Sequence, residues 1–236
     1  MTACEHDAEE TYVPDDALVD EIQALPIAQR MFRNSKVYPF RPVQVSIDNC
    51  DAETSLFGNW AGILCDLTQE DVTHVAANLV QGPALYGANK IEYVFQGYDA
   101  GTGAVIKVVR FGSIVTGHAG IIHGGLIAAF FDDAFGSIFF QQMKARHTGV
   151  TANLSVNYRA PMPAGTNVVF VLWVEREEGR KVFLRAEARS VLDNEIDSDF
   201  EGIASEAIGQ RWAGKRSVLY AEATALFIKV NKVEAK

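Results

Sequence analysis

The pattern of apolar and polar residues divides most of the chain into a β-rich stretch, one long apolar segment and a second β-rich stretch. Residues 88–111 hold two segments rich in β-branched and aromatic residues around a Gly-rich turn, which predicts a hairpin. The segment from about Gly125 to Met143 is longer than an ordinary strand and is rich in alanine and phenylalanine. This length and composition predict a buried helix.

Four further strands are expected after this helix. The segment "GVTANLSVNYRAP" alternates strictly, which places Val150 and Leu154 on one face and Thr151 and Asn153 on the other. Two strands are predicted in "NVVFVLWVEREEGRKVFLRAEARSVL", around a turn at 177–180, and a last one in "SVLYAEATALFIKV". A curved antiparallel sheet can cover only part of an apolar helix, so we expect a second subunit to cover the remainder.

The N-terminal third gives weaker signals. Helical spacing in "DDALVDEIQALPIAQRMF" follows an aspartate cap at 15 or 16, and Pro26 limits or kinks this helix. The two prolines of "SKVYPFRPV" indicate an extended arm. We therefore divide the chain into an N-terminal extension, residues 1–80, and a main α+β domain, residues 81–236, with a polar insertion near 194–214.

Composition narrows the classes of partner and location. The net charge of −9 disfavours binding to nucleic acid or to an anionic membrane surface. The three cysteines lack metal-type spacing, which disfavours a zinc site or a disulfide framework and favours an intracellular location, cytoplasmic or mitochondrial. No apolar run reaches the roughly 20 residues of a membrane span, and the acidic start differs from the basic leaders of secreted or mitochondrial proteins.

The tripeptide "HGG", residues 123–125, stands where the long helix is expected to begin. The first N–H groups of a helix have no intrahelical acceptor, so those of Gly124 and Gly125 could stabilise an oxyanion. The same tripeptide could equally form a tight turn into a buried helix. His123 could act as a base, or could orient the loop through its ring nitrogens. The other histidines show no ligand spacing, so no metal site is expected.

Two adjacent carboxylates interrupt the apolar helix. Asp132 lies on the same side as Gly125 but roughly 10 Å further along the axis, so one acyl carbon cannot contact both groups. If they act together, the carboxylate must come from an antiparallel helix of a second subunit. Asp132 could also be a hydrogen-bonded structural acid, and Asp133, rotated by about 100°, is the competing catalytic candidate. Ser137 could hydrogen-bond to Asp133.

Four segments in order, "IIHGGLIAAFFDDAFG", "TANLSVNYRAPMPAG", "EEGRKVFLRAEARSV" and "AEATALFIKVN", resemble a known family. They are similar to hotdog-fold acyl-CoA thioesterases of the phenylacetate-pathway type, most closely to the branch of thioesterase superfamily members 4 and 5. The resemblance covers about residues 90–192 and 217–231. It implies a hotdog fold, with a long central helix wrapped by a curved antiparallel sheet, in a homodimer or a dimer of dimers.

The resemblance also implies an activity and a set of catalytic residues. The chain is expected to hydrolyse acyl-CoA to a free acid and CoA in fatty acid metabolism, with no cofactor besides the CoA of its substrate. The backbone at His123, Gly124 and Gly125 would bind the oxyanion, Asp132 would serve as general base or nucleophile, and Thr151 would help to place the attacking water.

Substrate contacts are expected from four other positions. Asn153 would line the site beside Thr151, and the phosphates of CoA would need positive charge, for which Arg159, Arg180 and Lys181 are candidates. Exposed basic residues next to turns are also commonly just solvated. Two other functions remain open: a hotdog hydratase or dehydratase, which would need a further histidine on the active face, and an acyl-CoA-binding module without turnover.

Overall fold

The computed structural model describes seven ranges of the chain, which are residues 12–33, 37–40, 79–80, 84–99, 103–143, 148–191 and 217–230. The insertion expected near 194–214 lies outside them. The same holds for most of residues 41–83 and for the connection 144–147 that follows the long helix.

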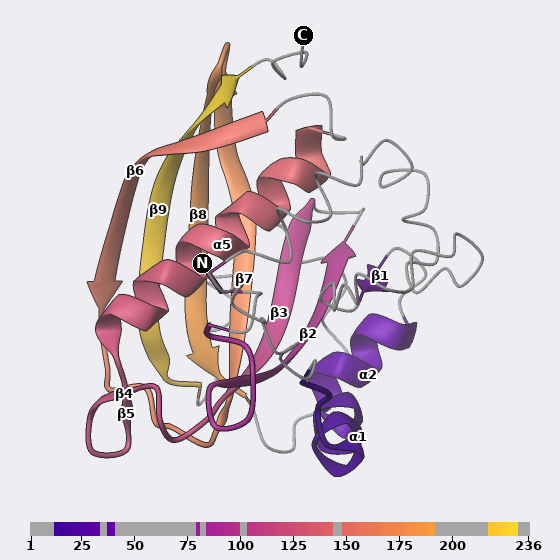
Figure 1. Cartoon of the computed structure of the whole chain (residues 1–236). Coiled ribbons are helices and arrows are strands. Elements are labelled where there is room, and N and C mark those ends of the chain that lie inside the picture. Colours follow the sequence, from indigo (N-terminus) through magenta and orange to yellow (C-terminus); the bar gives the residue numbers. More distant parts are fainter. Residues whose placement is uncertain are drawn as a thin grey trace, which may run out of the picture.

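A seven-stranded antiparallel sheet forms the framework (Figure 1). In spatial order its strands are β1 (Val37–Phe40), β2 (Ile91–Asp99), β3 (Ala104–Phe111), β7 (Asn167–Glu178), β8 (Lys181–Ser190), β9 (Leu219–Val230) and β6 (Thr148–Tyr158). Both predicted hairpins are confirmed, as β2–β3 and β7–β8. The expected extended arm contributes the short edge strand β1, and β6 forms the opposite edge.

A small two-stranded sheet that the apolar pattern did not predict precedes the long helix. Its strands β4 (Thr116–His118) and β5 (Ile121–Ile122) pair antiparallel, and the main-chain N–H of Ile122 donates to the carbonyl of Met162. These contacts connect the start of the helix to the loop that follows β6.

The predicted central helix is confirmed as α5 (Gly124–Met143), which crosses one face of the curved sheet (Figure 1). Its apolar residues occur in adjacent pairs every four positions, so they form one broad face rather than covering the helix all round. That face packs against strands β2, β3, β7, β8 and β9. Its buried side chains are Leu126, Ile127, Phe130, Phe131, Ala134, Phe135, Ile138 and Phe139.

The opposite side of α5 is less buried and carries small residues. Gly125, Ala129 and Gly136 lie on it at near-helical spacing, and Asp132 lies at its edge. A Cβ added at Gly136 would meet no atom of the described chain within 4 Å. The described part of the sheet therefore covers this stripe of α5 only in part, and we call it the uncovered stripe.

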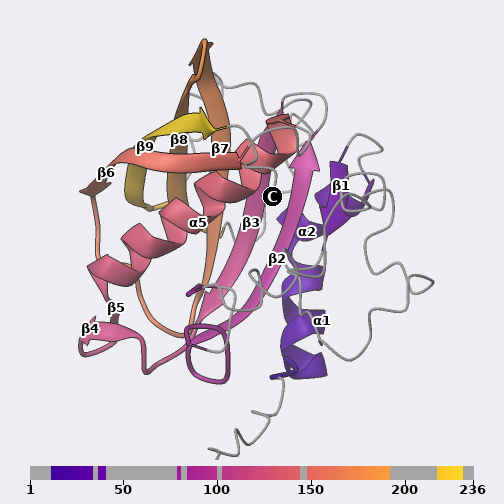
Figure 2. The same ribbon diagram turned by 45° about the horizontal axis from the view of Figure 1, so that its top comes forward.

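Two short helices pack on the other face of the sheet (Figure 2). They are α1 (Asp16–Ala24), capped by the Asp15 side chain, which accepts from the N–H of Ala17, and α2 (Pro26–Arg33). Proline is favoured at the first position of a helix, so Pro26 separates two helices rather than bending one. Ile22 is fully buried against β2, β3 and β7. No helix of the described ranges has the length and apolarity required to cross a membrane.

Candidate active site

His123 caps the start of α5 with its own side chain. The ring Nδ1 of His123 accepts from the N–H of Gly125 at 2.9 Å, and the main-chain N–H of His123 donates to the carbonyl of Val115 at 3.0 Å. The neutral ring therefore carries its proton on Nε2. Within the described ranges the N–H of Gly124 has no acceptor, so it is the available donor of the HGG segment.

Tyr158 holds the other side of the HGG segment. Its hydroxyl donates to the carbonyl of Gly124 at 2.7 Å, and its ring lies where a Cβ at Gly124 would be 3.4 Å away. Strict alternation along β6 predicts for Tyr158 only that it shares the face of Val150 and Leu154. Its position at the end of β6 carried no signal of this contact, because the contact depends on how β6 packs beside α5.

Asp132 and Thr151 meet in one chain. The hydroxyl of Thr151 donates to Oδ1 of Asp132 at 2.8 Å, which links β6 to the middle of α5. Asp132 lies eight residues beyond Gly124, or about 12 Å along the helix axis. The structure thus brings together two of the predicted catalytic side chains, and it keeps both away from the HGG segment of the same chain.

A β-bulge in β6 sets the direction of the Thr151 side chain. Thr151 pairs with Phe227 of β9, whereas Asn153 pairs with the adjacent Leu226, so Ala152 is an extra residue in the ladder. Directly paired residues face the same side of a sheet, and Phe227 belongs to the core beneath α5. Thr151 therefore faces α5.

The same bulge corrects the strict alternation predicted for this strand. Because Leu226 and Phe227 point to opposite faces, Asn153 lies on the opposite face from Thr151, and the prediction that it lines the site beside Thr151 is wrong. Leu154 shares the face of Thr151 instead, since it pairs with Ala225 and packs against the core.

The side chain of Asp133 points toward β3, whereas that of Asp132 points toward β6. Oδ2 of Asp133 lies 4.0 Å from Nζ of Lys107 on β3, and the two side chains are only 7% and 4% exposed. Nζ of Lys107 also donates to Oγ of Ser137 at 2.9 Å, and that hydroxyl donates to the carbonyl of Asp133 at 3.3 Å. The expected contact between Ser137 and Asp133 thus exists, but it reaches the main-chain carbonyl.

Lys107 is the charged residue that sequence reasoning missed. Burial lowers its pKa, and the nearby carboxylate of Asp133 opposes that shift. The available signal was a lysine at the position of β3 that alternation places on the same face as Val105 and Val109, both of which are buried in the core. That this lysine is buried in the core depends on its partner Asp133 on α5, and the sequence of β3 alone does not indicate that partner.

The three basic residues expected to bind phosphate do not gather in one chain. Arg159 follows β6 at the HGG end of α5 and forms an ion pair with Glu222. Lys181, beside Arg180 in the β7–β8 turn, is in register with Ile228, which pairs with Val150 at the other end of β6. The two groups are therefore separated by roughly 25 Å along the strand.

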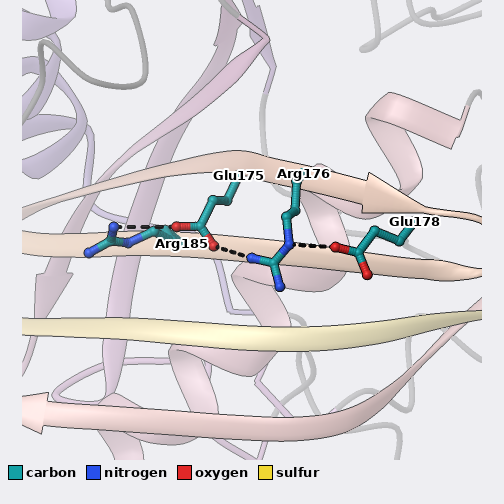
Figure 3. A network of polar contacts seen from close by, with 4 residues as sticks. All are labelled: Glu175, Arg176, Glu178 and Arg185. Atoms are coloured by element: carbon teal, nitrogen blue, oxygen red, sulfur yellow. Dashed lines mark hydrogen bonds and ion pairs between the residues drawn. The ribbon is translucent and has the colours of Figure 1, made fainter.

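A surface network of charged side chains runs along β7 and β8 near their turn (Figure 3). Arg176 contacts Glu175 at 3.1 Å and Glu178 at 2.8 Å, and Arg185 contacts Glu175 at 3.4 Å. Arg180 and Lys181 are exposed. Among the described residues, they are basic side chains near this turn that form no ion pair.

The central helix wrapped by a curved antiparallel sheet defines a hotdog fold. Residues 119–195, which include the HGG segment, Asp132 and Thr151, match the family model described as "Thioesterase superfamily". This part of the chain is therefore similar to thioesterase-superfamily domains.

Curated relatives match the same half of the chain. The "Acyl-coenzyme A thioesterase THEM4" of Bos taurus is 32% identical over 123 residues, which covers 51% of this chain and 38% of the relative. The protein of the same name from Xenopus laevis is 32% identical over 133 residues, which covers 56% and 48%. The chain thus spans less than half the length of these two relatives.

Solved structures show a more remote likeness. Protein smu.793 of Streptococcus mutans bound to acetyl CoA is 16% identical, with a TM-score of 0.41, over 56% of this chain and 86% of that one. The E. coli PaaI protein of the phenylacetic acid degradation operon is 11% identical, with a TM-score of 0.40, over 55% and 75%.

Proposed function

We propose that this protein is an acyl-CoA thioesterase whose active site is completed by two subunits. The HGG segment of one subunit binds the thioester carbonyl through the N–H of Gly124. Asp132 of the other subunit activates the attacking water or attacks the carbonyl itself. The names of the curated relatives and the family of residues 119–195 support the reaction class.

The observation that carries the proposal is the placement of Asp132. Its carboxylate is oriented by the hydroxyl of Thr151 and lies about 12 Å along α5 from the N–H of Gly124. A carbonyl carbon and its oxygen are little more than 1 Å apart, so the two groups of one chain cannot act on one thioester. A two-fold dimer with antiparallel α5 helices would bring Gly124 of one copy to Asp132 of the other, twice.

Two uncovered surfaces support this dimer. The stripe of small residues on α5 allows another helix to approach closely, and nothing in the described chain covers Gly136. β6 is an edge strand whose outer hydrogen-bonding groups have no strand partner among the described residues. The exposed Val150, at 49%, and Tyr158, at 53%, lie at its two ends. A partner that docks along β6 would bury both.

The proposed chemistry uses few groups. The N–H of Gly124 at the positive end of α5 stabilises the oxyanion that forms when the carbonyl is attacked. In the general-base route, Asp132 takes a proton from water beside Thr151 and then returns it to the departing CoA thiolate. In the nucleophilic route, the carboxylate attacks the carbonyl carbon, the C–S bond breaks and CoA leaves as the thiolate, and water then hydrolyses the resulting anhydride to the free acid and the aspartate. Both routes need an ionised Asp132.

The same two-fold arrangement accounts for the separated basic residues. Arg159 lies at the HGG end of its chain, whereas Arg180 and Lys181 lie at the end where β6 begins. Antiparallel pairing would place Arg159 of one subunit at the end of the site that carries Arg180 and Lys181 of the other. This cluster would bind the phosphates of CoA.

The test is thiol release from a panel of short, aromatic and long acyl-CoAs, with Asp132→Asn and Asp133→Asn in parallel. Asparagine keeps the shape of Asp132 and can still accept from Thr151, but it cannot take a proton. We expect Asp132→Asn to lower kcat by about 10³-fold while acyl-CoA binding persists, and Asp133→Asn to lower it far less.

Other outcomes would assign a different function. Binding without thiol release by the wild type would indicate an acyl-CoA-binding module, and hydration of an enoyl-CoA would indicate a hydratase. Full activity of Asp132→Asn would remove Asp132 from the mechanism. Loss of activity confined to Asp133→Asn would transfer the catalytic role to its neighbour.

We further propose an intracellular location, in the cytoplasm or in mitochondria. A relative from Candida albicans, 27% identical over 116 residues, carries the description "Uncharacterized protein, mitochondrial" and supports the second compartment. Imaging of the full-length chain with a C-terminal fluorescent tag, beside a mitochondrial marker, tests this. A signal confined to the secretory pathway would contradict it.

A further inference from the structure

The two adjacent acids of α5 are held by opposite flanks of the sheet. Thr151 on the edge strand β6 binds Asp132, and Lys107 on β3 lies against Asp133. In the order of the sheet, three strands separate β3 from β6. The two contacts therefore act on α5 from its two sides, on either side of the uncovered stripe.

Directional contacts are needed here because the apolar face of α5 is broad. Apolar packing against a curved sheet fixes the rotation of a helix about its axis only loosely. A buried polar contact, by contrast, can form at only one such rotation. The Lys107 ammonium reaches both Asp133 and Ser137, which lie one turn apart on the same strip of the helix. This two-point contact fixes the rotation of α5, and with it the direction of Asp132.

The charges of the cluster have a second effect. Asp132 and Asp133 are consecutive, so two bare carboxylates would repel each other and favour protonation of the proposed base. The ammonium of Lys107 offsets the negative charge of Asp133. The carboxylate of Asp132 can then accept a proton from water. Removal of one member of this buried pair changes the net charge beside Asp132 by one unit.

We propose that Lys107 is a positioning residue, which acts through Asp133 to fix the direction and the charge state of the catalytic carboxylate of Asp132. This inference rests on the proposed role of Asp132. Among the described contacts, α5 contributes Asp133 to this cluster, β3 contributes Lys107, and β6 contributes the Thr151 hydroxyl. In the proposed dimer the HGG segment of the second copy also faces Asp132.

The test compares Lys107→Met, Asp133→Asn and the double variant by carbon-13 NMR titration of the Asp132 carboxyl in the full chain. Lys107→Met should raise the titration midpoint of Asp132 by about one pH unit, because one positive charge near its carboxylate is removed. Asp133→Asn should lower the midpoint, because the negative charge next to Asp132 is removed. The double variant, which lacks both charges, should return to within a few tenths of a unit of the wild type.

Activity supplies an independent reading. The acid limb of the kcat/KM profile, measured with the acyl-CoA that the wild type hydrolyses fastest, should move with the NMR midpoint. Lys107→Met should also lower kcat by about tenfold while KM changes little, because Asp132 is misdirected. A merely structural role would destabilise both single variants without moving the midpoints in opposite directions.

The possible failures are distinguishable. Midpoints that stay unchanged, shift in the same direction or do not return in the double variant would overturn the role of Lys107. If Lys107→Met does not fold, two other results decide the question. They are the lower titration midpoint of Asp132 in Asp133→Asn and its return toward the wild-type value in the double variant. If the wild type releases thiol from no acyl-CoA, the proposed function fails, but the NMR titration still shows whether Lys107 controls Asp132.

Discussion

The proposed site depends on a few hydrogen bonds that each occupy one group and leave another available. The ring of His123 accepts a hydrogen bond from the N–H of Gly125, so the N–H of Gly124 remains available to a ligand. Thr151 takes one oxygen of Asp132, which leaves the other for water or for a carbonyl carbon. His123 is thus assigned to the cap of α5 by its contact, rather than to proton transfer.

The hydroxyl of Thr151 is expected to matter more than its bulk. Thr151→Val removes the donor and preserves the shape, so the carboxylate of Asp132 loses its fixed orientation. We predict that kcat falls by about 10- to 100-fold in steady-state thiol-release assays. Thr151→Ser retains the hydroxyl and is the matched control. Equal losses in the two variants would mean that the methyl group, rather than the hydrogen bond, is needed.

At the scale of elements, the edge strand β6 organises both ends of the site. Its bulge at Ala152 turns Thr151 toward Asp132, and its last residue, Tyr158, binds the carbonyl of Gly124. A regular strand could not do both, because residues 151 and 158 are an odd number of positions apart and would face opposite sides. The extra residue puts them on the same side.

Deletion of Ala152 tests this role of the bulge. Removal of the extra residue restores a regular ladder with β9, so the side chain of Thr151 turns to the outer face. We predict a folded protein, by circular dichroism, with kcat lowered at least as far as in Thr151→Val. The control, Ala152→Gly, keeps the bulge and should stay within about threefold of the wild type. An active deletion variant would show that the bulge is dispensable.

These elements were predictable from the sequence to different degrees. The helix Gly124–Met143 and the β7–β8 hairpin were predicted because their signals are local, in periodicity and in turn residues. The bulge at Ala152 was not predicted, because an extra residue in β6 can be recognised only from its pairing with the neighbouring strand β9. For the same reason Asn153 was placed on the wrong face, whereas Asp132 and Thr151 were found through the motifs that contain them.

At the scale of the whole molecule, one sheet separates two cores. α5 fills one face, and α1 and α2 cover β2, β3 and β7 on the other. Arg110 of β3 forms an ion pair with Glu21 of α1, and the side-chain amide of Asn167 of β7 donates to the same carboxylate. Among the described residues, the uncovered stripe of α5 and the edge of β6 have no further cover, which fits the proposed dimer.

The N-terminal helices are expected to be part of the stable fold. Ile22 is 0% exposed between α1 and the sheet, so Ile22→Ala leaves a cavity in the second core. We predict a loss of about 2–5 kcal/mol in the free energy of unfolding, measured by urea denaturation. The control, Val13→Ala, removes a side chain that is 73% exposed and should cost less than about 0.5 kcal/mol. Equal effects would mean that α1 is only loosely attached.

A heterodimer of two different variants tests most directly whether the site spans two chains. One subunit carries Gly124→Pro, which removes the N–H at the first helical position, where proline is tolerated. The other subunit carries Asp132→Asn. Gly124→Ala, which keeps the N–H, is the control for the first change.

Each homodimer of these variants should be inactive, because every site lacks one group. In the purified heterodimer, one site lacks both groups and the other retains Gly124 from one chain and Asp132 from the other. We predict that the heterodimer regains about half of the activity of the wild-type dimer, because one of two equivalent sites is intact. A heterodimer as inactive as its parents would show that Gly124 and Asp132 act within one chain, and would contradict the proposed site.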